Sequence, residues 1–495
     1  MGKAQLKFSL EKGLYEHALI LRDQSPLIPL FKLIITKKLF FEIKVLITCV
    51  MQVNLKHEIE NLNLGDKRRD TRIVKIINQL VSKPGSSIVE NGESWSDVKM
   101  TYRFYNKDTV KESAIADCIF KATLERCKGS EVVLSIQDTT SINFASSAEG
   151  LGYLDHGQGE GLMVHNNLVV DQRGCPLGLI DQKIWARDKA EMGKAETRGQ
   201  RSIEQKESYR WIESMQQSEA LLKDCCKKIV HIADREADIY ELISAPRAPQ
   251  SELLIRATHN RKTLLDNNMW DEIEQEPIIA RFEVEIGNCK SQTTRIATMI
   301  VKAGMVLVSP PPKKKHLPAM LLNGIIVREE NNANKEEPIE WRLITTMAVN
   351  STEDVLQIVK WYSFRWRIER LHFILKSGCR LEDLQLRNVK ALRKATLIYS
   401  LCAFKLMQLL YLARQQPDEP CTSYLEDKEW KTLMKITTKL PYTIAKPPTL
   451  QQAVVMLARL GGFLARKNDG PPGIKNLWRG MQKLHVILNA LDYVY

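Results

Sequence analysis

Acidic side chains follow two short apolar runs that lie far apart in the chain. Asp138 closes the run VVLSIQD (Val132–Asp138), and Asp234 closes the run IVHIAD (Ile229–Asp234). Such runs, rich in Val and Ile, predict strands of a sheet core, each with its acid at the strand end. Two carboxylates at neighbouring strand ends repel each other, and a divalent cation bound between them removes that repulsion.

A third acid, Glu369, belongs to a set of residues with helical spacing. Tyr362, Arg365, Glu369 and Lys376 stand at i, i+3, i+7 and i+14. At about 100° per residue they share a stripe about 60° wide and about 21 Å long. Glu369 could complete a metal site while Arg365 and Lys376 bind phosphates. A weak surface pair of Arg365 and Glu369 would account for part of this spacing without any function.

The elements that would carry the acids follow a familiar order. The runs 165–172 and 176–185 flank an Arg-Gly turn and predict a hairpin, and residues 252–258 predict a further strand. The charge-dense stretch from 186 to about 218, which predicts a loop and then a helix, and a helical segment after Asp234 separate these strands. Three strands followed by helix, strand, helix and strand match an RNase H-like α/β core.

The rest of the chain separates into regions with different hydrophobic patterns. Alternating strand-like runs between about 269 and 348 predict an all-β insertion, which contains the basic turn Pro310–Lys315. A capping box at Ser351 predicts a helix that continues through Lys376. From about 391 the pattern is mostly helical. We expect a helical region at 51–112, a mixed region that contains the sheet core at 113–410 and a helical region at 411–495.

The charge balance favours a polyanionic partner. The 495 residues include 72 Lys and Arg against 59 Asp and Glu, a net charge of +13. Nucleic acid is the simplest such partner, although a merely basic protein would have the same balance. The ten cysteines include no C-x-x-C pair and no zinc spacing, which indicates reduced thiols in the cytoplasm.

Residues 1–50 differ in character from the rest of the chain. The apolar stretch 27–50 is interrupted by five charged residues, so it does not predict a membrane-spanning helix, and we expect no membrane partner. Met51 comes directly after this stretch. We expect residues 1–50 to be an atypical extension that is not part of the native protein.

A basic helix is expected directly after Asp66, which can cap it, and it would run to about Val81. Arg68, Arg72 and Lys75 fall on the side opposite its apolar residues. That side could meet DNA phosphates, or it could be an ordinary solvated face.

Three stretches resemble the catalytic blocks of the insertion-sequence-four family of DDE transposases. They are QDTTSINF (137–144), ADREADIY (233–240) and YSFRWRIERLHFILK (362–376), and the last one fits the family's Y-(2)-R-(3)-E-(6)-K signature. Further similar stretches are LGDKRRDTRI (64–73), TYRF (101–104), LLIRATHNRK (253–262), EWRLIT (340–345) and ARLGGF (458–463). The likeness extends over about 54–488.

The resemblance implies a function for each block. Asp138, Asp234 and Glu369 would bind two Mg²⁺ ions, for which Mn²⁺ could substitute. The DNA contacts would come from eight residues. They are Tyr362, Arg365, Lys376, Trp341, Arg256, Arg68, Arg69 and Arg72. Trp341 would stack on a flipped base, although a core aromatic on a strand fits the same pattern.

The family further implies a cut-and-paste DNA transposase that acts as a homodimer on two transposon ends. It would cleave by hydrolysis, pass through a DNA hairpin and join 3′-OH ends to target DNA, in the bacterial cytoplasm at the nucleoid. Two alternatives remain open. One is an RNase H-like nuclease without strand transfer. The other is a non-catalytic DNA-binding protein or inactive element remnant, which the intact acids and Y-R-E-K residues disfavour.

Overall fold

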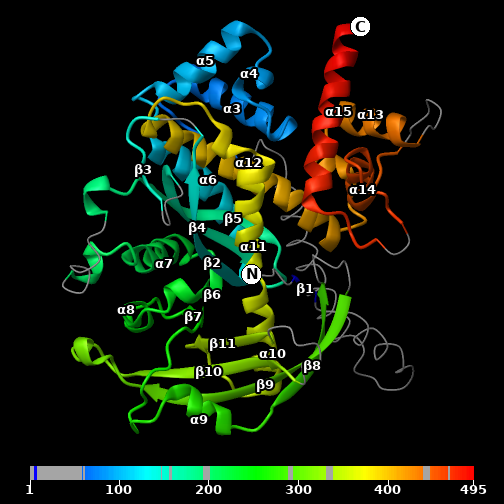
Figure 1. Cartoon of the computed structure of the whole chain (residues 1–495). Coiled ribbons are helices and arrows are strands. Elements are labelled where there is room, and N and C mark those ends of the chain that lie inside the picture. The colour runs from blue at the N-terminus through cyan, green and yellow to red at the C-terminus, as the bar shows by residue number, and fades with distance from the viewer. Residues whose placement is uncertain are drawn as a thin grey trace, which may run out of the picture. The chain divides into compact units, whose positions relative to one another are not determined.

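The computed structural model shows a mixed α/β protein (Figure 1). It describes residues 5–7, 58, 62–145, 148–154, 159–192, 201–287, 294–330, 338–438, 446–466 and 469–494. The chain forms two compact units. Residues 48–229 and 366–495 make the first, here called the α/β unit, and residues 1–47 and 230–365 make the second, the β unit.

Helices precede the sheet of the α/β unit. They are α3 (Lys67–Ser82), α4 (Ile88–Asn91), α5 (Trp95–Asn106) and α6 (Glu112–Cys127). The predicted cap of α3 is confirmed, because Asp66 Oδ1 accepts a hydrogen bond of 2.9 Å from the Arg68 backbone N–H. The apolar side of α3 is buried, as its spacing predicts.

The sheet of the α/β unit is antiparallel. Its strands are β2 (Ser130–Asn143), β3 (Gly152–Tyr153), β4 (Glu160–Asp171) and β5 (Pro176–Trp185). The predicted β4–β5 hairpin is confirmed. The expected end of β2 at Asp138 is wrong, because β2 continues pairing with β4 as far as Asn143. Three of the five residues from Thr139 to Asn143 are β-branched, two Thr and one Ile, and β-branched residues suit a strand.

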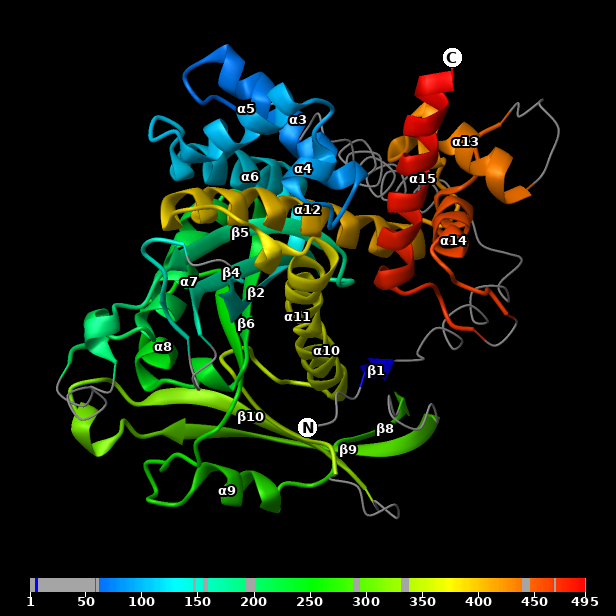
Figure 2. The same ribbon diagram turned by 45° about the horizontal axis from the view of Figure 1, so that its top comes forward.

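Helices cover both faces of this sheet. Helix α7 (Tyr209–Leu222) packs on one face, where Ser214 Oγ accepts a 3.2 Å hydrogen bond from Asn167 on β4. Helices α11 (Trp366–Phe373) and α12 (Val389–Gln415) pack on the other (Figure 2). Helix α12 is long and apolar enough to cross a membrane, and its most apolar window is entirely buried inside the protein.

The C-terminal part of the α/β unit is helical, as predicted. It contains α13 (Asp427–Thr438), α14 (Leu450–Leu460) and α15 (Ile474–Val494). The sequence predicts breaks at Gln416–Thr422 and at Pro447-Pro448, and the described residues there lie between α12 and α13 and just before α14. The eight cysteines within the described ranges form no disulfide.

The β unit contains an antiparallel sheet in the order β1-β8-β9-β10-β11-β7. The strands are β1 (Gln5–Lys7), β7 (Ser251–Arg256), β8 (Ala280–Gly287), β9 (Thr294–Val308), β10 (Met320–Glu329) and β11 (Glu340–Thr345). Strand β6 (Cys226–Ala233) leads into this unit, and η5 (Arg235–Ala237) and α8 (Tyr240–Ser244) come after it.

Two details of the predicted all-β insertion are wrong. Residues Met269–Gln275 form helix α9, which packs on β10 so closely that a Cβ added at Gly324 would lie 2.1 Å from Ile273 Cδ1. The runs RIATMIV (295–301) and MVLVS (305–309), whose pattern predicts two separate strands, form the single strand β9. The middle of β9 pairs with β10 without interruption, with Gly304 opposite Gly324.

The expected unbroken helix from Ser351 to Lys376 is also wrong. The capping box of Ser351 with Asp354 is present, but α10 (Thr352–Ser363) ends before Phe364. Helix α11 starts at Trp366, and a π-helix occupies Ile374–Gly378. Tyr362, Phe364 and Arg365 are all buried, so this stretch lacks the single buried face on which the prediction of a regular helix depended.

The expectation about residues 1–50 falls mostly outside the described residues. Of that segment only Gln5–Lys7 is described, as the strand β1 that pairs with β8. The apolar stretch 27–50 lies outside the described residues as well.

Candidate active site

Asp138 lies in the middle of β2, directly opposite Asn166 on β4. Its Oδ1 accepts a 2.9 Å hydrogen bond from the Thr139 backbone N–H. Its Oδ2 lies 3.7 Å from Nδ1 of His372 on α11, and 15% of the side chain is exposed. The carboxylate is therefore held by its neighbours and still accessible to a ligand.

Glu369 lies on α11 one turn before His372. Residues three apart on a helix are neighbours on its surface, and α11 packs against β2. Since His372 approaches Asp138, α11 also carries the half-exposed Glu369 towards the same part of β2. The α/β unit thus brings two of the three predicted acids to one region.

A second polar group lies on the opposite side of β2. Arg210 Nε donates a 2.9 Å hydrogen bond to Thr139 Oγ1, and Thr139 Oγ1 lies 2.9 Å from His165 Nδ1. Burial, with help from the positive charge of Arg210, holds the pKa of His165 well below its usual value, so this imidazole is neutral. Sequence reasoning missed these residues, although HNN within the apolar strand run was a signal.

Asp234 belongs to the β unit, immediately after β6. It caps η5, where its Oδ1 accepts a 2.9 Å hydrogen bond from the Glu236 backbone N–H. Burial raises the pKa of Tyr362 to about 12, an effect that the charges of Arg365 and Arg256 oppose and that of Asp234 reinforces. These four predicted residues therefore lie within electrostatic reach of one another.

Arg256 and one further predicted residue, Trp341, are packed in the same unit. Arg256 Nη2 donates a 3.0 Å hydrogen bond to the Glu340 carbonyl, and burial lowers the pKa of this guanidinium. The Trp341 ring is only 7% exposed and meets the Tyr362 ring edge-on, with 5.1 Å between centroids. Trp341 is thus packed against protein, as the alternative of a core aromatic predicts, and it presents no open face in this structure.

The predicted stripe of four residues is divided between the units. Tyr362 and Arg365 belong to the β unit, and Glu369 and Lys376 to the α/β unit. Lys376 lies in the π-helix, half-buried, and burial lowers its pKa although Glu382 opposes the shift.

The predicted basic helix α3 offers fewer accessible arginines than its sequence suggested. Arg68 is exposed. Arg69 Nη1 donates to the Leu64 carbonyl at 3.1 Å, and Arg72 forms an ion pair with the buried Asp97. Arg72 therefore contributes to the packing of α3 on α5.

The donor types suit a hard divalent cation. Throughout the described part of the chain, no three His, Cys, Asp or Glu side chains are grouped closely enough to hold a metal ion. Asp138 and Glu369 nevertheless supply carboxylate oxygens from two packed elements of one unit, β2 and α11. Carboxylates are the ligands preferred by Mg²⁺ and Mn²⁺, so these residues fit such ions.

Two regions of the chain match known protein families. Residues 51–110 match a transposase DNA-binding family. Residues 401–495 match the Tn5 transposase dimerisation domain. The chain belongs to the Tn5 and insertion-sequence-four family of transposases. In this transposase the first match covers α3 to α5, and the second covers the C-terminal half of α12 together with α13 to α15.

Among solved structures, this transposase is similar to the cryo-EM structure of a piggyBac transposase synaptic complex with hairpin DNA. The identity is 8% and the TM-score 0.35, over 91% of this chain and 82% of that chain. A likeness this distant carries no argument about the fold or the reaction.

Proposed function

We propose that this transposase excises a DNA element and joins it to a new site, with Asp138, Asp234 and Glu369 as its catalytic acids. The observation that carries this proposal is the packing of α11 on β2, with His372 3.7 Å from Asp138 and Glu369 one turn away. Asp234 brings the third carboxylate from a cluster that also contains Tyr362 and Arg365.

The three acids would hold two Mg²⁺ ions, with Mn²⁺ as a substitute, which would activate the attacking oxygen and stabilise the leaving oxygen. Around them, Arg256, Arg365 and Lys376 would bind the phosphates next to the reacting bond. Guanidinium groups suit this role because they donate two parallel hydrogen bonds and keep their charge when buried.

The reaction would proceed by successive in-line attacks at phosphorus. Water first frees a 3′-OH at the transposon end, and this 3′-OH attacks the opposite strand to form a hairpin. A second water opens the hairpin, and the 3′-OH then attacks target DNA. Tyr362 would act through DNA contact, since its raised pKa makes it a poor nucleophile. Trp341 would have to leave its packed position to stack on a flipped base.

The family matches support the proposed partners. The DNA-binding match contains the exposed Arg68 on α3, which would contact the terminal repeat. The dimerisation match supports a homodimer that holds two transposon ends and target DNA. We further propose that residues 51–112, 113–410 and 411–495 are the DNA-binding, RNase H-like catalytic and dimerisation domains, and that the protein works in the bacterial cytoplasm at the nucleoid.

The test uses the purified full chain and a DNA fragment that carries the gene with its native flanking sequence. We expect Mg²⁺-dependent cleavage at both ends of the element and joining to a supercoiled plasmid. Asp138→Asn and Glu369→Gln should lose at least about 10³-fold in cleavage rate while still binding the DNA. Glu125→Gln, which changes an exposed acid on α6, is the matched control. Wild-type cleavage by Asp138→Asn would refute the proposal, and cleavage without joining would indicate a nuclease.

A further inference from the structure

A row of polar side chains crosses the sheet of the α/β unit and ends at Asp138. The register places Asp138 on β2 opposite Asn166 on β4, and Asn166 opposite Gln182 on β5. Directly paired residues point to the same face of a sheet. His372 of α11 and Ser400 of α12 approach this row from the helices that cover that face.

Continuous contacts join the five side chains. Ser400 Oγ lies 2.8 Å from Gln182 Nε2, which also donates to Asn166 Oδ1. Asn166 Nδ2 lies 2.9 Å from His372 Nε2, and His372 Nδ1 lies 3.7 Å from Asp138 Oδ2. Asn166 is 0% exposed, Ser400 1% and His372 7%. Buried polar groups are costly unless they are paired, so this row fixes its members in place.

The donor and acceptor pattern fixes the form of His372. Because Asn166 Oδ1 accepts from Gln182, its Nδ2 must face His372 and donate to Nε2. A neutral imidazole that accepts at Nε2 carries its hydrogen on Nδ1, the atom nearest Asp138. If the side-chain amides of Asn166 and Gln182 were both reversed, Nε2 of His372 would have to carry the hydrogen. The lone pair of Nδ1 would then face the negatively charged carboxylate of Asp138, which is unfavourable.

We propose that His372 is a positioning residue that orients the Asp138 carboxylate, and that Asn166 and Gln182 set its tautomer. This inference rests on the proposed function, in which Asp138 binds the catalytic metal. A donor on Nδ1 restrains one carboxylate oxygen and directs the other towards the ion. Residues that orient a metal ligand in this way are worth about 10–100-fold in metal affinity or activity.

The first test compares two replacements of His372. Asparagine keeps a donor near the Nδ1 position and loses the contact with Asn166, whereas glutamine keeps that contact and loses the donor to Asp138. Mn²⁺ binding to the full chain with its transposon-end DNA is measured by electron paramagnetic resonance, alongside cleavage and melting temperature. We expect His372→Gln to weaken Mn²⁺ binding at least about 10-fold and His372→Asn to weaken it less than about 3-fold.

Gln182→Glu gives a second test, which does not depend on the His372 variants folding. A carboxylate at this position can only accept from Asn166, so the Asn166 amide turns over and the Nδ1 lone pair of His372 faces Asp138. We expect Mn²⁺ binding to weaken about 10-fold. A simple effect of the added negative charge has the opposite sign, since it would strengthen cation binding. Glu125→Gln, which changes an exposed acid on α6 outside the row, is the control and should bind Mn²⁺ like the wild type.

The outcomes separate the inference from the function on which it rests. Equal Mn²⁺ affinity in His372→Gln and His372→Asn, whether normal or weakened, would overturn the positioning role. So would unchanged or tighter binding in Gln182→Glu. Unchanged Mn²⁺ affinity in Asp138→Asn would instead refute the proposed metal site itself.

Discussion

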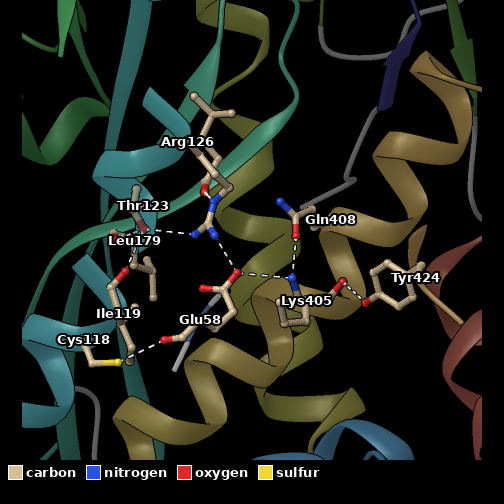
Figure 3. A network of polar contacts seen from close by, with 10 residues as sticks. Glu58, Cys118, Ile119, Thr123, Arg126, Leu179, Lys405, Gln408 and Tyr424 are labelled. Atoms are coloured by element: carbon tan, nitrogen blue, oxygen red, sulfur yellow. Dashed lines mark hydrogen bonds and ion pairs between the residues drawn. The ribbon is translucent and has the colours of Figure 1, made fainter. Parts of the chain in front are cut away.

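Replacing Glu58 by glutamine should destabilise the α/β unit by about 3–5 kcal/mol, because it leaves two buried cations without their anion. Glu58 Oε1 lies 2.5 Å from Arg126 Nη1 on α6 and 3.2 Å from Lys405 Nζ on α12 (Figure 3). The three side chains are 0%, 2% and 1% exposed. Glu58 lies within the DNA-binding match and Lys405 within the dimerisation match, so this ion triad connects the two regions.

The magnitude can be worked from the distances and the burial. At an effective dielectric constant of about 20, unit charges at these two separations attract by about 7 and about 5 kcal/mol. Desolvation of three buried ions offsets most of that attraction in the intact triad. Loss of Glu58 removes the attraction and leaves the desolvation cost of Arg126 and Lys405, which gives the net penalty.

The pH dependence has a definite sign. Burial lowers the pKa of Lys405 to about 8, although Glu58 opposes the shift. Without Glu58 that pKa falls further, while in the unfolded chain it stays near 10.5. At a pH between the pKa of Lys405 in the folded variant and its pKa in the unfolded chain, the unfolded state binds more protons than the folded state. The free energy of unfolding of Glu58→Gln should therefore rise as the pH rises from about 6 to 9.

Urea unfolding of the full chain, monitored by circular dichroism at several pH values, measures both effects. Glu125→Gln is the matched control, since its pair with Lys128 at the end of α6 is exposed and should contribute little to stability. Replacing all three members of the triad by Leu or Met should restore much of the stability. A loss below about 1 kcal/mol in Glu58→Gln, or a stability that falls over this pH range, would refute the reasoning.

Three further predictions concern binding and stability. Asp97→Asn should cost about 1–3 kcal/mol in urea unfolding, because the buried carboxylate accepts hydrogen bonds from Gln79 and Arg72. Those hydrogen bonds oppose the effect of burial and hold the pKa of Asp97 well below its usual value. The extra stability of the wild type over Asp97→Asn should therefore be complete above about pH 4 and decline as the pH falls. A stability difference that grows in acid would contradict this. Lys376→Gln should weaken binding to transposon-end DNA and reduce the salt dependence by about one phosphate contact, and an unchanged slope of log affinity against log salt would contradict a phosphate contact. Removal of divalent ions with EDTA should abolish cleavage but leave DNA binding in a gel-shift assay, and Mg²⁺ or Mn²⁺ should restore cleavage, so persistent cleavage in EDTA would contradict metal-ion catalysis.

The sequence alone determined several local elements and the family. Asp66 and Ser351 indicated their helix starts because a side-chain cap acts within three residues, and the β4–β5 hairpin was readable from its turn and alternation. The three acid-bearing blocks likewise led to the family that the two matched regions support.

Tertiary structure decided what depends on contacts between distant segments. Strand β2 continues past Asp138 because it pairs with β4. The helix that starts at Ser351 ends at Ser363, where the following residues are buried on several sides. Local propensity reveals neither of these contacts. Arg72 forms an ion pair with Asp97. The sequence predicted Arg72 as a DNA contact, whereas in the structure its side chain contributes to the packing of α3 on α5. His372 lies beside Asp138 only because α11 packs on β2. The two residues are 234 positions apart in the chain, and no local pattern specifies their contact.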